Sequence, residues 1–243
     1  GDTEIVFHGD VSWRDTNDYK IPDFEKSSVL RDLEDEDVEP AGIAGNSATN
    51  TKAGSAGLSL IFGNGFLGMN VKKVDSQYGL PGGSSEEGEE EGEEESVTID
   101  LDQTRYDLHG ELEGNYGWFK KAKFRFGYGD YLHTELEGDE IGTVFANEGW
   151  ESRLDFIEKG GTNWGGATGI QVQFRDYSAV GAEAFVPPTQ STQFGIYSVK
   201  DFSYGAWQFE VGGRYESTEH QACLLYQYSD SYAAQTETTG RRR

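Results

Sequence analysis

Two sets of residues have the types and spacing of a site for a metal cation. The first is an acidic run at residues 86–95, and the second is a pair of His-x-Glu motifs further along the chain. Carboxylates alone suit hard cations such as Ca²⁺, Mg²⁺ and Mn²⁺, whereas imidazole suits zinc. The candidate metal ligands are Glu86, Glu87, Glu89, Glu90, Glu91, Glu93, Glu94, Glu95, His109, Glu111, His133 and Glu135.

The acidic run has two interpretations. It can act as an electrostatic funnel that raises the local concentration of cations. Alternatively it is a solvated loop with no defined site, because like charges repel one another. A second acidic segment, at residues 32–39, is open to the same two interpretations, and an ordinary acidic surface is the favoured one.

The two His-x-Glu motifs place both side chains on one side of a strand, about 7 Å apart. If His109–Glu111 and His133–Glu135 met across a hairpin, the four residues could form a relay for a metal ion. That arrangement needs the right strand register. A polar lining without metal is the favoured interpretation.

Composition excludes several other functions. The formal net charge of −24 argues against nucleic-acid binding, which needs a basic surface to neutralise phosphates. One cysteine and four histidines leave no disulfide framework and no cysteine-based zinc site. The sequence has no nucleophile elbow and no phosphate-binding glycine motif with a lysine. We therefore expect a protein that is not an enzyme and that requires no cofactor.

The elements that must position these residues are strands. Although only 35% of the residues are hydrophobic, 13% are aromatic, and apolar and polar residues alternate repeatedly. The alternation predicts an all-β, antiparallel fold of about nine strands. Two features break the pattern. Asp130 falls on an apolar face, and residues 97–101 have the opposite parity to residues 106–112, which requires either a bulge near Gln103 or an end that lies clear of the apolar layer. The predicted strands lie near residues 5–14, 54–62, 67–71, 104–112, 122–135, 149–157, 170–175, 190–199 and 207–216.

Short and long connections alternate along the chain. The turns near residues 63–65, 115–119, 159–164 and 201–205 are short, whereas residues 22–50, 78–96, 136–147 and 178–190 are predicted to be long loops. Many strands are long for a soluble sheet. Apolar strand faces with aromatic ends, polar opposite faces and this alternation of loops are typical of an outer-membrane β-barrel, with short periplasmic turns and long acidic extracellular loops.

Several segments together resemble the barrel of TonB-dependent outer-membrane receptors, and most closely their zinc-receptor-like branch. The resemblance spans roughly residues 3–218. It rests on residues 75–82 (DSQYGLPG), 97–108 (VTIDLDQTRYDL), 126–138 (FGYGDYLHTELEG), 142–143 (GT), 147–153 (NEGWESR) and 176–188 (DYSAVGAEAFVPP).

The resemblance implies a plug-filled barrel of about 22 strands in the outer membrane of a Gram-negative bacterium. Its partners would be membrane lipid, the TonB complex, contacted through the plug, and a transported metal ion or metal complex. In the zinc branch the loop that corresponds to residues 86–95 tends to contain histidine, and this loop contains none, which puts zinc specificity in doubt.

The sequence also departs from the family. Nothing in it resembles the plug, the TonB-contacting box or the closing strand with its terminal aromatic residue. We therefore expect residues 1–219 to be an internal part of the barrel, and residues 220–243 to be an off-pattern tail that reflects truncation or a reading-frame artefact. Two other functions stay open: a soluble secreted β-sandwich that binds Ca²⁺ through acidic loops, and an outer-membrane barrel hydrolase.

Overall fold

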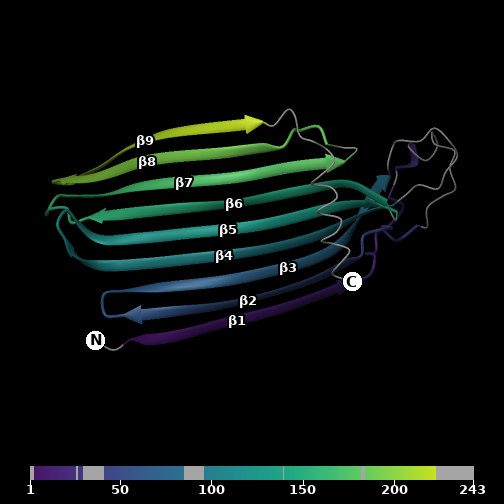
Figure 1. The fold of residues 1–243 in the computed structure, drawn as a ribbon, viewed down its shortest axis with the longest axis horizontal. Coiled ribbons are helices and arrows are strands. Elements are labelled where there is room, and N and C mark those ends of the chain that lie inside the picture. Colours follow the sequence, from purple (N-terminus) through teal and green to yellow (C-terminus); the bar gives the residue numbers. More distant parts are fainter. Residues whose placement is uncertain are drawn as a thin grey trace.

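The computed structural model describes residues 3–25, 27–29, 41–84, 96–138, 140–181 and 184–222. These residues form one antiparallel sheet of nine strands, in which each strand pairs with the next along the chain (Figure 1). The all-β, antiparallel prediction and the strand count are confirmed. The strands are β1 (Glu4–Thr16), β2 (Thr49–Phe62), β3 (Gly65–Ser84), β4 (Ser96–Tyr116), β5 (Phe119–Glu137), β6 (Glu140–Glu158), β7 (Trp164–Gly181), β8 (Thr189–Tyr204) and β9 (Trp207–Ala222).

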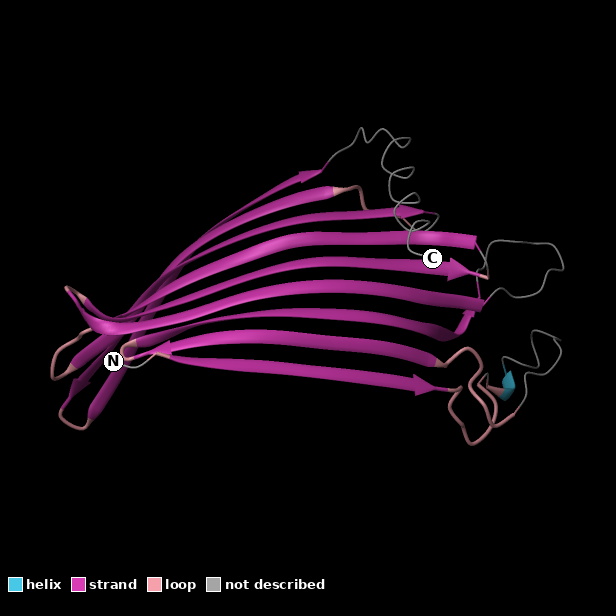
Figure 2. Cartoon of the chain, turned by 60° about the horizontal axis from the view of Figure 1, so that its bottom comes forward, coloured by secondary structure: helices cyan, strands magenta, loops and turns pink. Residues whose placement is uncertain are grey.

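The sheet is a single curved layer that does not close on itself (Figure 2). Within the described ranges, each strand contacts only its neighbours in the sheet, so no second layer covers either face. β1 and β9 therefore have one strand neighbour each. Among the same residues, no helix is long and apolar enough to span a bilayer.

The turns and loops lie at opposite ends of the strands. The four predicted short turns, β2–β3, β4–β5, β6–β7 and β8–β9, share one end (Figure 1), which we call the turn end, and the opposite end is the loop end. The predicted long loop at residues 136–147 is wrong, because β5 continues to Glu137 and β6 begins at Glu140. Backbone pairing extends the strands here despite the acidic side chains. β9 likewise continues to Ala222, past the expected end of the pattern at Glu219, and residues 223–243 lie outside the described part.

One face of the sheet carries most of the large apolar side chains, and we call it the apolar face. Because directly opposed residues share a face, the register places Tyr106, Tyr128, Trp150 and Phe174 in a single row across β4 to β7. We call this the aromatic row. Two rows of mainly aliphatic and phenylalanine side chains follow it towards the turn end. They are Leu108–Phe126–Ser152–Val172–Phe194 and Gly110–Phe124–Leu154–Ile170–Ile196.

The register explains both sequence exceptions. Asp130 lies in a row with Glu148 and Asp176, one step beyond the aromatic row towards the loop end, so it marks the border of the apolar band. Residues 97–101 lie further out still, beyond that border. The predicted bulge near Gln103 is wrong, since the pairing of β4 with β5 is continuous from Val97 to Glu113.

The sheet has almost no interior. The only buried hydrophobic residues in the described part are Ala44, Ile99 and Ala179, whereas Ile170, Phe194 and many other large apolar side chains of the apolar face are more than a third exposed. A sheet of nine strands whose apolar face is open to its surroundings needs something apolar to cover that face.

Candidate functional site

The opposite face of the sheet, which we call the polar face, carries a cluster of arginines at mid-strand. Arg125 of β5 lies directly opposite His109 of β4 and Arg153 of β6, and Arg153 lies opposite Gln171 of β7. Arg214 of β9 reaches the Gln171 Oε1 atom at 3.3 Å. The strands thus bring three arginines and one histidine into one region of a chain that is strongly acidic overall.

Three arginines of this face pair with a carboxylate two residues further along the same strand. Arg105 Nη2 lies 2.8 Å from Asp107 Oδ1. Arg153 Nε lies 3.0 Å from Asp155 Oδ2, and Arg214 Nε lies 2.7 Å from Glu216 Oε2. Residues two apart on a strand share a face, so the R-x-D/E spacing is a signal in the sequence, although the metal-site hypothesis did not include it.

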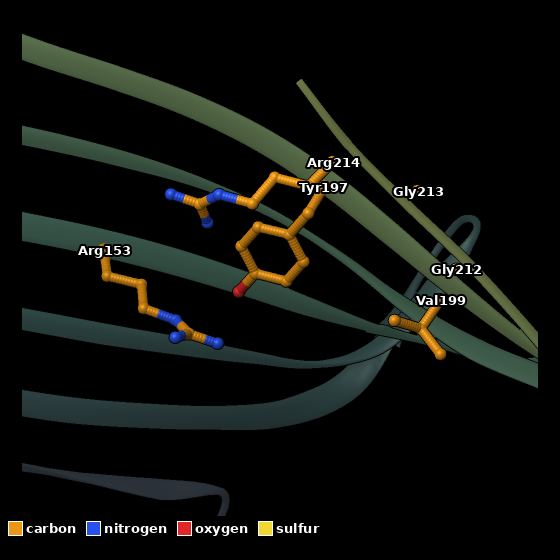
Figure 3. Close-up of a pocket in the computed structure, with 6 residues that line it drawn as sticks. All are labelled: Arg153, Tyr197, Val199, Gly212, Gly213 and Arg214. Carbon is orange, nitrogen blue, oxygen red and sulfur yellow. The ribbon is translucent and has the colours of Figure 1, made fainter. Parts of the chain in front are cut away.

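Tyr197 of β8 lies between two of these guanidinium groups (Figure 3). The Arg153 Cζ atom is 5.0 Å from the centroid of the tyrosine ring and the Arg214 Cζ atom is 5.9 Å from it, which are cation–π distances. Arg153, Tyr197 and Arg214 line an open pocket of about 410 Å³ together with Val199, Gly212 and Gly213. The Tyr197 hydroxyl is buried and has no hydrogen-bond partner among the described residues.

Gly169 of β7 makes room for the Tyr197 ring. A Cβ atom at this position would lie 2.3 Å from the Tyr197 hydroxyl oxygen and 2.6 Å from Asp155 Oδ1, closer than side-chain atoms approach. A side chain directly opposite Tyr197 would require the tyrosine ring and the Asp155 carboxylate to move, and glycine leaves both in place.

A second pocket, of about 360 Å³, adjoins the first through Arg153 and extends over β4 and β5. Arg125 lies within it and makes no ion pair or hydrogen bond in the described part of the chain. Like charges directly opposite each other on neighbouring strands destabilise a sheet, and Arg125 faces Arg153 in this way. Arg125 is therefore a guanidinium group of this pocket that lacks a carboxylate in contact with it, whereas Arg105 and Arg153 each have one.

The predicted metal ligands are not brought together. The glutamates of residues 86–95, and the acidic segment at residues 32–39, lie outside the described residues. His109 lies opposite Arg125 whereas His133 lies opposite Leu101, so the two histidines are eight residues apart in register, about 27 Å along the strands. The four-residue relay is wrong. No group of three or more metal-ligating side chains occurs among the residues that the structure describes.

His109, Glu111 and His133 contact residues outside the two motifs. His109 packs edge-on against Phe66, with ring centroids 5.2 Å apart, and Glu111 accepts a hydrogen bond of 2.6 Å from Lys121. His133 lies 3.0 Å from the Tyr131 hydroxyl through Nδ1, and its Nε2 atom is 3.7 Å from Glu135. These contacts fit a polar lining and give no ligand geometry.

His133 is expected to make the stability of the fold depend on pH. Burial lowers the pKa of His133, so the folded chain keeps a neutral imidazole where the unfolded chain takes up a proton. The contribution of the neutral His133 to the stability of the fold is thus fully present above the ordinary histidine pKa of about 6.5, and it is lost as the pH falls below that value. Urea unfolding at several pH values should show this loss, and His133→Gln should flatten it. Equal slopes in both proteins would contradict the prediction.

A search of the sequence against models of known protein families finds no match.

Proposed function

We propose that the chain is part of a transmembrane β-barrel in the outer membrane of a Gram-negative bacterium. In this proposal it belongs to a receptor of the TonB-dependent type, which takes up a metal ion or a metal complex. The observation that carries the proposal is the apolar face, whose large side chains have no covering layer in the described part of the chain. Membrane lipid is the covering that such a face would have in a barrel.

The height of the apolar band supports the proposal. On β7 the band runs from Phe174 in the aromatic row to Trp164 at the turn end, a distance of ten residues or about 33 Å along the strand. A strand tilted by about 40° would cover about 25 Å of bilayer with this length, which is the height of the apolar band in outer-membrane barrels. Trp118, Phe202 and Trp207 supply further aromatic residues at the turn end, where an aromatic girdle belongs.

The opposite face and the open edges also support it. A barrel interior is polar, and the polar face carries the arginine and carboxylate pairs described above. A sheet with unpaired edge strands is prone to aggregate, and further strands would remove both edges by closing a larger barrel. In the family that the sequence resembles, about 22 strands surround a plug that contacts the TonB complex, and the metal is cargo rather than a resident cofactor.

Neither alternative function gains support from the fold. A soluble β-sandwich needs two sheets packed face to face, and the described residues form one layer. An outer-membrane hydrolase needs a nucleophile, a base and a group that orients the base. The Ser191 hydroxyl lies 2.8 Å from His220 Nδ1, but this contact is exposed and no carboxylate accepts a hydrogen bond from His220 among the described residues.

Membrane fractionation tests the proposal. We expect the chain, expressed with its native flanking sequence, to remain in the outer-membrane pellet after a urea wash. We also expect its gel mobility to change on boiling, because closed barrels resist detergent denaturation until they are heated. The unboiled sample is the internal control. Recovery in the soluble fraction, with the same mobility before and after boiling, would contradict the membrane assignment.

Transport needs a separate measurement. Cells that carry the intact gene should accumulate more zinc or zinc chelate than cells in which it is deleted, and collapse of the proton gradient should abolish the difference. Equal accumulation in both strains under metal limitation would argue against metal uptake while leaving the barrel assignment in place.

A further inference from the structure

We infer that the polar face holds a binding pocket for an oxyanion, a carboxylate or a phosphate group, with Arg125 and Arg153 as its main ligands. The pocket spans β4, β5 and β6, has a volume of about 360 Å³ and is lined by Arg105, Asp107, His109, Arg125, Glu151 and Arg153, among others. The inference goes beyond the proposed function, because it assigns an anion site where that function concerns a metal.

The acidic side chains of the pocket are already engaged. Asp107 accepts three hydrogen bonds from Arg105, at 2.8–3.0 Å, and so neutralises that guanidinium. Glu151 accepts a hydrogen bond of 2.7 Å from the neutral amide of Gln171, so it keeps its negative charge, but it forms no ion pair with an arginine among the described residues. No carboxylate of the pocket forms a hydrogen bond or an ion pair with Arg125 in the described part of the chain.

Arg153 is only partly satisfied. Asp155 contacts its Nε atom, at 3.0 and 3.2 Å, and the structure gives the two terminal nitrogens no partner within the described ranges. The Arg153 side chain is held in place by the Tyr197 ring, over which its guanidinium group lies (Figure 3). Arg153 thus presents free N–H donors from a fixed position, as a binding residue must.

The placement of the two arginines suits an oxyanion. Directly opposed residues on neighbouring antiparallel strands have Cβ atoms about 5 Å apart, so both guanidinium groups can reach one small ligand. Guanidinium N–H groups match the geometry of carboxylate and phosphate oxygens and bind them in a bidentate manner. An anion between Arg125 and Arg153 would also remove their mutual repulsion. His109, on the other side of Arg125, can add a ring N–H donor.

The overall charge of the chain works against non-specific binding of anions. With a net charge of −24, the molecule repels anions at long range. Affinity for an anion must therefore come from local contacts, and a volume of about 360 Å³ is that of a small-molecule site rather than of a flat protein surface.

Calorimetric titration of the full chain in an uncharged detergent tests the inference, with citrate and inorganic phosphate as probes. We expect at least one of them to bind, and Arg125→Gln to weaken that binding at least tenfold. Arg14→Gln is the matched control, because Arg14 lies on the same face, on β1, and the variant loses the same charge outside the pocket. Its affinity should stay within twofold of the wild type.

The outcomes separate the sources of the anion. Binding of citrate alone identifies a carboxylate ligand, binding of phosphate alone identifies a phosphate group, and binding of both identifies a general oxyanion site. Absence of binding at millimolar concentration of either probe, or equal weakening by Arg125→Gln and Arg14→Gln, would overturn the inference.

A second variant keeps the result interpretable. If Arg125→Gln does not fold, Arg125→Lys keeps the charge and removes the fork of donors, and it should bind less tightly than the wild type; equal affinity would overturn the role of Arg125. The pocket does not depend on what covers the apolar face. Anion binding by a chain recovered from the soluble fraction would refute the membrane proposal and leave the anion site standing.

Discussion

Ile170→Arg is expected to destabilise the folded chain by about 2–4 kcal/mol when the protein is in lipid, the cost of an arginine on the outer face of a barrel near the bilayer midplane. Ile170 lies on the apolar face of β7, between Leu154 and Ile196 of the neighbouring strands, and midway between Phe174 and Trp164. Its side chain is 38% exposed. If the apolar face lies against lipid, as we propose, that exposed surface faces hydrocarbon, where a guanidinium group is poorly solvated.

The size of the effect of Ile170→Arg shows whether the apolar face contacts lipid or water. An exposed residue of a soluble protein tolerates such a change within about 0.5 kcal/mol. Gln173→Arg is the control, because Gln173 lies three residues away on the polar face, directly opposite Glu151, where a new positive charge is favourable. Urea unfolding in lipid vesicles, followed by tryptophan fluorescence, gives both free energies. Equal values for the two variants would exclude a lipid-facing role for Ile170.

The strands and faces were predictable from the sequence because alternation is a local property. Side chains alternate between the two faces of a strand, so residues 149–157 or 170–175 indicate strands without any knowledge of their neighbours. The prediction of a long loop between β5 and β6 was wrong because composition does not show pairing. Residues 135–140 are acidic with one glycine, which is the composition of a loop, whereas pairing with neighbouring strands holds Glu137 and Glu140 in the sheet.

The candidate site could not be predicted, because it depends on register. A strand sequence shows that His109, Arg125, His133 and Arg153 face the same side, but not which of them lie side by side. Register pairs His109 with Arg125 and places His133 far along the strand, which removes the expected metal relay and creates the arginine pocket. Asp130 seemed an exception for the same reason, since its partners Glu148 and Asp176 become visible only when strands are aligned.

Lys200→Met is expected to destabilise the fold by about 3 kcal/mol, because it leaves the Glu158 carboxylate without its cation. Both residues lie on the apolar face near the turn end. The Lys200 stem crosses over Gly166, where any Cβ atom would clash with it, and Lys200 Nζ contacts Glu158 Oε1. Thr168 donates a second hydrogen bond to the same oxygen, at 3.0 Å. Glu158 is only 8% exposed, and removal of one partner from a buried ion pair costs about 3–5 kcal/mol. The lower end of that range applies, because the Lys200 side chain is 34% exposed.

The double variant Lys200→Met, Glu158→Gln decides whether that loss comes from the unpaired charge. The glutamine keeps an oxygen that can accept the Thr168 hydrogen bond and removes the charge, so the double variant should recover most of the stability, as replacement of both partners of a buried pair often does.

Lys73→Met is the matched control. Lys73 and Asp102 form an exposed pair on the same face at the loop end, with side chains 51% and 37% exposed, and the loss of this pair should cost less than about 1 kcal/mol. If Lys200→Met and Lys73→Met have equal effects on the free energy of unfolding, the turn end of the apolar face is hydrated. If only Lys200→Met is severe and Glu158→Gln rescues it, the ion pair lies in an apolar surrounding.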